Sequence, residues 1–262
     1  MSLVDRVIAS LRHHHDLLAR LVPTLDEAAL TSPSAATEWR VCDVLSHLGS
    51  GAEITLRPLA AAAAGTPAPE AANQEVWDRW NAMPPAEQAT GFVTADARVV
   101  EALEALDDDE RASLSVDLGF LPAPVPLLMA AGMRLNEVAL HTWDVLAGLA
   151  GSDDPIPLDE EAAEVLLELY TGPLAMMTAW AGKPDELDEV TIVAFENHGL
   201  TIAEEIVLVA EPPVAPTAHF AGPVEAAVRL VTGRLRPDTT PEGVGVTGNV
   251  TLDDLRRVFP GY

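Results

Sequence analysis

Two residues that could share a metal ion stand four positions apart in the middle of the chain, Glu137 and His141. They fall in an apolar segment that predicts one long helix, from about Pro126 to Leu149, so both side chains project from the same helical face. A carboxylate and an imidazole suit a divalent ion such as zinc, and a third ligand from another helix would complete a site open to water or substrate. Because such a pair also occurs by chance in helix-rich proteins, a purely structural role stays open.

His47 is the obvious third ligand. It lies beside Leu45 and Leu48, on or near the apolar face of a second predicted helix, where an unpaired imidazole ring would be costly. Asp43, one turn before His47, and Asp144, three residues after His141, are candidates for carboxylates that orient the two imidazole rings.

Other reactive side chains give weaker signals. The histidine run at 13–15 is expected to be a solvated patch, because consecutive helical residues point about 100° apart and cannot converge on one ion. Cys42 is the only cysteine, which excludes an internal disulfide and a cysteine zinc site and favours a small buried side chain over a nucleophile. Trp143, two residues after His141, is expected to pack in the core or to line a pocket.

The apolar spacing predicts helices that would position these residues within a helical first half. Residues 3–22 form the first, and residues 41–64 the second, with Thr37 as N-cap and Gly65 as stop. Long helices joined by proline-containing loops fit an antiparallel bundle, with function between facing helices. The elements expected after the second helix are a short helix over 73–82, a long helix over 84–106, a solvated acidic turn at 107–110 and the helix over 126–149.

The character of the sequence changes after a linker over residues 151–157. We therefore expect an α+β protein with two domains, a helical bundle over residues 1–152 and a smaller α/β domain over residues 153–262. The pattern of the second domain predicts, in order, a helix over 158–181, strands over 190–195 and 202–209, a helix over 224–235 and a terminal helix from Leu252.

The charge balance excludes several classes of partner. Fifteen basic against forty-one acidic residues give a formal charge of -26, and nucleic acids and anionic membrane surfaces bind proteins largely through Lys and Arg. The charged residues among the first 16 leave no uncharged core of the kind a secretory signal has, and no charge-free run reaches the ~18 residues of a spanning helix. We expect a cytoplasmic protein with no nucleic-acid or membrane partner, either a monomer or a homodimer.

Two segments together resemble a known family. Residues 39–48, WRVCDVLSHL, taken with the ExxxHTWD motif at 137–144, are similar to the paired signature of the mycothiol-dependent maleylpyruvate isomerase family. The segment 222–235 and the VTG at 246–248 are similar to that family's smaller C-terminal domain. The resemblance implies a DinB-like four-helix bundle followed by an α/β domain.

The resemblance also implies a site. In the family a histidine, a glutamate and a histidine hold a divalent metal, usually taken as zinc, and they correspond to His47, Glu137 and His141 here; nickel is the alternative metal. An arginine of the C-terminal domain reaches towards the substrate, and the Gly-Arg pair puts this role on Arg234. Arg229 is the alternative, and a purely structural role for Arg234 stays open. Mycothiol would be the thiol cosubstrate.

A bound cation lowers the pKa of a thiol and so makes it a nucleophile. The resulting hypothesis is an enzyme that uses mycothiol for isomerisation or S-transfer on a small electrophilic substrate. Two alternatives stay open. One is a non-catalytic metal-binding protein whose C-terminal domain binds a ligand or partner, and the other is an enzyme that hydrolyses its substrate with metal-bound water.

Overall fold

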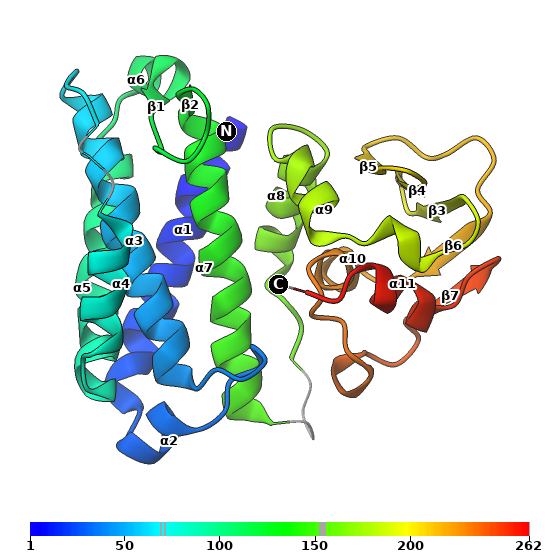
Figure 1. Ribbon diagram of the computed structural model, residues 1–262, viewed down its shortest axis with the longest axis horizontal. Coiled ribbons are helices and arrows are strands. Elements are labelled where there is room, and N and C mark those ends of the chain that lie inside the picture. Colours follow the sequence, from blue (N-terminus) through cyan, green and yellow to red (C-terminus); the bar gives the residue numbers. More distant parts are fainter. Residues whose placement is uncertain (69, 71, 152–155, 262) are drawn as a thin grey trace. The chain divides into compact units, whose positions relative to one another are not determined.

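The computed structural model describes residues 1–68, 70, 72–151 and 156–261. It divides into two compact units, Met1–Gly151 and Ser152–Tyr262. The first is built mainly from helices and the second carries a five-stranded sheet (Figure 1), so the α+β class predicted from the sequence is confirmed. The predicted domain boundary, between residues 152 and 153, lies outside the described residues.

Four long helices make up most of the first unit. α1 and α3 each pack against both α5 and α7, so the four helices enclose one core. That core consists of apolar side chains from each helix, such as Leu11, Leu45, Phe92 and Leu135. The long helices are α1 (Leu3–Leu21), α3 (Val41–Ala63), α5 (Pro85–Glu104) and α7 (Leu127–Ala150).

Short elements connect the long helices. They are the 3-10 turn η1 (Val22–Thr24), α2 (Glu27–Thr31), α4 (Asn73–Asn81), α6 (Asp108–Ser113) and a two-stranded ribbon of β1 (Ser115–Val116) and β2 (Val125–Pro126). Residues 107–110 are exposed, as predicted, but the predicted turn is wrong, because these residues begin α6. The Asp107 side chain accepts a hydrogen bond from the Glu110 amide at 2.9 Å, and the Glu110 carboxylate accepts one from the Asp107 amide at 2.9 Å. Acidic residues stabilise a helix start in this way.

α3 begins at its predicted first residue, Val41, but without the predicted cap. The residue before it is Arg40, not Thr37, and the Arg40 amide donates to the Asp43 carboxylate at 2.9 Å. The helix ends just before Gly65, whose φ of 64° lies in the left-handed region. Gly65 is therefore the stop that the sequence predicted, because glycine adopts that conformation without strain.

Two glycines in the middle of α3 allow close packing against its backbone. A Cβ at Gly49 would clash with the Trp80 ring, and a Cβ at Gly51 would lie 3.0 Å from the Arg134 guanidinium. Arg134 Nη2 donates to the carbonyl of Leu48 in the same stretch, at 2.9 Å. Glycine weakens an isolated helix, but here it makes room for two large side chains.

A buried ionic network crosses the core of the first unit. Asp96 of α5 accepts a hydrogen bond from Arg134 of α7 at 2.7 Å and lies 3.0 Å from His15 of α1. The solvated patch predicted for the histidine run is wrong, because His14 and His15 are buried and only His13 is exposed. Asp96 supplies the partner that makes burial of the His15 ring possible.

The second unit contains a sheet with strand order β5-β4-β3-β6-β7. β3 and β6 are parallel, and the other neighbouring strands are antiparallel. The strands are β3 (Thr191–Phe195), β4 (His198–Ile202), β5 (Ile206–Val209), β6 (Ala218–Ala221) and β7 (Gly245–Gly248). The helices are α8 (Glu160–Tyr170), α9 (Ala175–Ala181), α10 (Val224–Val231) and α11 (Leu252–Val258), with 3-10 turns η2 (Pro184–Glu186) and η3 (Pro237–Thr239).

Three predicted elements of this unit differ from the structure. The helix expected over 158–181 is divided into α8 and α9, because Gly172 and Pro173 interrupt it. The strand expected over 202–209 is divided into the end of β4 and all of β5. α10 ends at Val231, before the predicted end at residue 235. Across the described residues, no helix is both long and apolar enough to cross a membrane.

Candidate metal centre

Three side chains that can bind a metal ion meet between α3 and α7. His47 projects from α3, and Glu137 and His141 project from α7, and one ligand atom of each lies within 4.8 Å of the others. Glu137 Oε2 lies 2.9 Å from His47 Nε2 and 3.7 Å from His141 Nε2. The structure therefore brings together the three residues that the sequence singled out as ligands.

The packing of two helices accounts for this arrangement. Glu137 and His141 share a face of α7 because they are four residues apart, and α3 packs against α7. The His47 and His141 rings meet edge to face, with their centroids 4.9 Å apart. The His141 side chain is nearly buried, whereas about a third of the His47 and Glu137 side chains is exposed. The cluster is thus open to solvent on one side.

Buried polar groups hold the two α7 residues. Asp144 Oδ2 lies 2.8 Å from His141 Nδ1, and Asp144 has no exposed surface. This contact agrees with the role that the sequence analysis gave to Asp144, and it leaves the other ring nitrogen directed at Glu137. Asn136 Nδ2 donates to Glu137 Oε1 at 3.1 Å. No pattern in the sequence points to this role of Asn136.

Asp43 does not orient His47, and this expectation is wrong. The Asp43 carboxylate accepts hydrogen bonds from Arg40 Nε at 2.8 Å and from Arg40 Nη2 at 2.7 Å. The hydrogen bonds from Arg40 also lower the pKa of Asp43. Asp43 lies one turn from His47, but it lies in the first turn of α3, where a carboxylate is drawn to the unpaired amides of the helix start.

Trp39 borders the cluster, although the sequence analysis gave it no role. Its ring centroid lies 5.1 Å from that of His47 and 5.8 Å from that of His141, and it is nearly parallel to the His141 ring. Trp39 is 37% exposed, whereas Trp143, the tryptophan considered as a pocket wall, is buried in the core. The available signal was an aromatic residue just ahead of the helix that carries His47.

The loop before α3 holds Trp39 by backbone contacts. The amide and the hydroxyl of Ser34 both donate to the Trp39 carbonyl, at 2.9 Å and 2.8 Å. The Ala35 amide donates to the Asp144 carbonyl of α7 at 2.8 Å. Glu38 has a φ of 66°, a left-handed conformation that is uncommon outside glycine. Asp144 therefore connects the cluster to the loop that carries Trp39.

Glu137 is held in its anionic form. Burial raises the pKa of its carboxyl, but the hydrogen bond from His47 and the charges of His141, His47 and Arg134 outweigh this effect and lower the pKa to about 2. An anionic carboxylate beside two imidazoles is a donor set that a divalent cation prefers.

The two C-terminal arginines have different surroundings. Arg229 has no exposed surface; its Nε and Nη2 donate to the Glu225 carboxylate at 2.7 Å and 3.1 Å, and its Nη1 donates to the Thr239 carbonyl at 2.8 Å. These contacts tie α10 to η3. Arg234 is 9% exposed and donates to the Thr232 carbonyl at 3.1 Å. Its role towards a substrate stays a prediction.

Cys42 packs in the core, as the sequence predicted. It is free and fully buried, and burial raises the pKa of its thiol. A buried, protonated thiol is a small apolar side chain rather than a nucleophile.

The helical first unit and the five-stranded sheet of the second define an α+β protein, and the cluster between α3 and α7 gives it a three-residue candidate metal site. The chain belongs to the family described as mycothiol maleylpyruvate isomerase N-terminal domain, whose sequence model matches residues 11–146, just over half of the chain. The matched segment includes His47, Glu137 and His141.

Solved structures share this fold. A crystal structure of the mycothiol-dependent maleylpyruvate isomerase superimposes with a TM-score of 0.64 at 19% identity, covering 95% of each chain. A histidine-to-alanine mutant of that isomerase gives the same TM-score and coverage at 18% identity. Two uncharacterized proteins, from two strains of Mycobacterium tuberculosis, are 26% identical over 174 residues, which are 64% of this chain and 80% of each relative.

Proposed function

We propose that this protein is an enzyme that uses mycothiol, with a divalent metal held by His47, Glu137 and His141, for isomerisation or S-transfer on a small electrophile. The observation that carries the proposal is the convergence of three donor atoms within 4.8 Å, in a domain of the mycothiol maleylpyruvate isomerase family.

The donor set fits a zinc ion with one side left open. Zinc binds nitrogen and oxygen at about 2.0–2.2 Å, so neighbouring ligand atoms around a tetrahedral ion lie roughly 3.4 Å apart. The separations of Glu137 Oε2 from the two histidine nitrogens, 2.9 Å and 3.7 Å, lie on either side of that value, and all three ligand atoms lie within 4.8 Å of one another. Three protein ligands with a fourth position open are typical of catalytic zinc sites. Imidazole also suits nickel, which is the second candidate.

The residues around the cluster have distinct tasks in this proposal. Asp144 fixes the His141 ring so that Nε2 faces the cluster. Asn136 occupies one oxygen of Glu137 and leaves the other for the cation. Trp39 presents an exposed aromatic surface beside both histidines, on which an organic thiol or electrophile can pack.

When bound, the cation supplies the positive charge that lowers the pKa of a thiol at the open position. In an isomerisation, the thiolate sulfur bonds to one carbon of an activated double bond, which becomes single and rotates. The sulfur then leaves with its electron pair, and the double bond re-forms. In an S-transfer, the carbon–sulfur bond is kept and a leaving group departs with the electrons of its own bond.

We also propose that Arg234, in the C-terminal domain over residues 153–262, orients an acidic substrate. A guanidinium is permanently charged and pairs with a carboxylate through two parallel hydrogen bonds. Arg229 suits this role less well, because its guanidinium is already bound to Glu225 and Thr239.

Metal content tests the site itself. Purified wild-type protein is expected to carry about one equivalent of zinc or nickel, measured by elemental analysis, and His47→Ala is expected to lose it. His13→Ala removes an exposed histidine of α1 outside the cluster and should keep the metal. A metal-free wild-type protein that does not take up either ion would refute the site.

Thiol-dependent turnover tests the chemistry. At least one of a panel of electrophiles that includes maleylpyruvate should be converted only when mycothiol is present, either isomerised with the thiol regenerated or joined to it with the thiol consumed. Glu137→Ala should lower the rate of that conversion at least about 100-fold. Stoichiometric metal without conversion of any electrophile would instead support a non-catalytic metal-binding protein. Turnover without any thiol would support hydrolysis by metal-bound water.

A further inference from the structure

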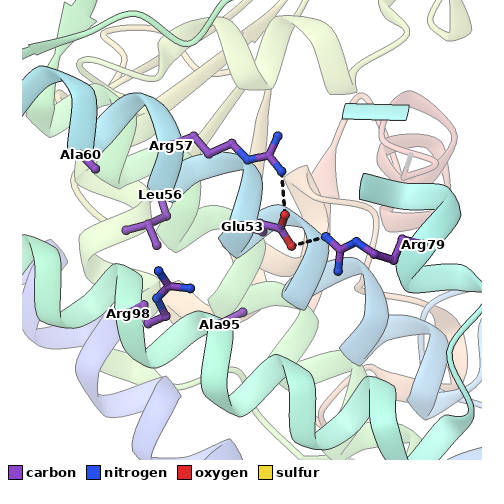
Figure 2. A pocket seen from close by; sticks show the side chains of 7 residues that line it. All are labelled: Glu53, Leu56, Arg57, Ala60, Arg79, Ala95 and Arg98. Atoms are coloured by element: carbon purple, nitrogen blue, oxygen red, sulfur yellow. Dashed lines mark hydrogen bonds and ion pairs between the residues drawn. The ribbon is translucent and has the colours of Figure 1, made fainter. Parts of the chain in front are cut away.

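Apart from the candidate metal centre, the first unit has a pocket of about 570 Å³ among α3, α4 and α5 (Figure 2). Its volume falls within the roughly 300–1,000 Å³ of typical small-molecule sites. The charged side chains that line it are Glu53, Arg57, Arg79 and Arg98. Three positive charges against one negative charge leave the pocket with a net charge of about +2, on a chain whose formal charge is -26. Such a local excess of guanidinium groups favours an anionic ligand.

Glu53 holds two of the arginines in place. Its Oε1 accepts a hydrogen bond from Arg57 at 2.7 Å, and its Oε2 accepts hydrogen bonds from Arg79 and from the Trp80 indole (Figure 2 draws the two arginine contacts). The Trp80 ring is buried against Gly49, so the carboxylate rests on a fixed support. Arg57 and Arg79 are thereby ordered before any ligand arrives, which lowers the entropy lost on binding.

Arg98 is the third arginine of the pocket, and Glu53 does not hold it. Within the described part of the chain its guanidinium forms no hydrogen bond and no ion pair, although it lines the pocket from α5 (Figure 2). A guanidinium offers five N–H donors. An anion in the pocket would give this group a partner.

The remaining lining residues are apolar, which favours an anion that carries a hydrocarbon part. Leu56 and Ala60 of α3 and Ala95 of α5 complete the wall. An inorganic phosphate or sulfate would leave this surface unfilled, whereas an organic acid would cover it with hydrocarbon. Guanidinium groups pair well with planar carboxylates, as Glu53 already illustrates, and two uncompensated positive charges match two carboxylates.

The pocket is separate from the candidate metal centre. Consecutive residues of a helix are rotated by about 100°, so Glu53, Leu56 and Ala60 lie on the side of α3 roughly opposite to His47. Arg57 is also displaced from His47 by ~15 Å along the helix axis, because each helical residue adds 1.5 Å. A ligand bound here would leave the His47 cluster accessible.

We propose that this pocket binds a small organic dicarboxylate. One carboxylate pairs with Arg98, the other with the free N–H groups of Arg57 and Arg79, and the hydrocarbon between them packs on Leu56 and Ala60. This site does not depend on the proposed metal chemistry.

Calorimetric titration of the full chain with succinate at low ionic strength tests the proposal. Succinate should bind saturably at one site, and its neutral diamide, succinamide, should not bind. Arg98→Gln should weaken succinate binding about tenfold, because a charge-assisted hydrogen bond is lost. Since the Arg98 guanidinium makes no hydrogen bond or ion pair within the described residues, this variant should melt at close to the wild-type temperature. Arg20→Gln, which removes an exposed arginine of α1, is the matched control and should leave the affinity unchanged.

Three results would overturn the proposal. The first is a wild-type protein that shows no saturable binding of succinate. The second is succinate binding that is equally strong in Arg98→Gln, because the ligand would then lie elsewhere. The third is inorganic phosphate that binds as tightly as succinate and is also lost in Arg98→Gln, because the pocket would then recognise charge without the hydrocarbon.

Discussion

His141 Nδ1 lies 2.8 Å from a carboxylate oxygen of Asp144, one turn further along α7. Asp144 is completely buried, and its backbone carbonyl also accepts the hydrogen bond from the Ala35 amide. One residue thus fixes both a candidate ligand and the loop that carries Trp39. The geometry of the cluster is therefore set by contacts outside the three ligands themselves.

Asp144→Asn should lower the affinity for zinc roughly 10-fold to 100-fold, because the loss of a carboxylate that orients a metal-binding histidine has effects of this size. The measurement is competition for zinc with a chelator of known affinity. Asp43→Asn is the matched control, since Asp43 also lies one turn from a cluster histidine but contacts Arg40. Equal losses in the two variants would contradict the assignment.

Trp39→Phe should remove most of the change in tryptophan fluorescence that accompanies nickel binding. The Trp39 ring lies within 6 Å of both histidine rings, so a quenching ion at the cluster acts on it strongly. Trp77→Phe, at another exposed tryptophan, should keep the change. A signal that persists in Trp39→Phe would mean that the ion binds elsewhere.

Gly148→Ala should displace the loop before α3 and destabilise the protein by about 1–3 kcal/mol, the usual effect of overpacking. A Cβ at Gly148 would lie 2.5 Å from Ser34 Cα and 2.8 Å from the Pro33 carbonyl oxygen. Gly245→Ala meets open space and should change stability by no more than about 0.5 kcal/mol. Urea denaturation measures both variants, and equal stabilities would show that the loop adapts without strain.

Asp96→Asn should destabilise the protein by about 3–5 kcal/mol, because it leaves the Arg134 guanidinium buried without a full counter-charge. Asp16→Asn breaks only a surface pair with Arg12 and should change stability by no more than about 1 kcal/mol. Unfolding in urea at neutral pH measures both. A similar small effect in the two variants would contradict a supporting role for the buried network.

The same network predicts a pH dependence. Burial raises the pKa of Asp96. The contacts with His15 and Arg134 lower the pKa by more than burial raises it, so the net shift is downward. Because the folded pKa lies below the unfolded value of about 3.9, the unfolded state binds more protons and stability falls as the pH drops below about 4. The acid limb of the stability curve should be shallower in Asp96→Asn, and an unchanged limb would count against this explanation.

Continuous patterns made the long helices predictable. The apolar spacing of α7 runs without interruption to Gly151, and the predicted and observed ends of the helix differ by one residue at each terminus. The second unit was harder because its strands are short. The turn between β4 and β5 is formed by residues 203–205, Ala-Glu-Glu, which contain neither glycine nor proline, so the strand pattern gives no sign of a break.

The site was predictable where it depends on one helix and obscure where it depends on distant contacts. Glu137 and His141 share a face by spacing alone. Asp43 and Asp144 both lie about one turn from a cluster histidine, yet only Asp144 contacts one, because Asp43 is used at the start of its helix. The burial of His15 depends on Asp96, 81 residues away, which no local pattern reveals.

All three candidate ligands, the carboxylate behind His141 and the loop with Trp39 come from the first unit. Mutations in the second unit leave every one of these residues unchanged. During evolution the two units can therefore diverge at different rates, and the cluster can be inherited intact while the other half of the gene changes.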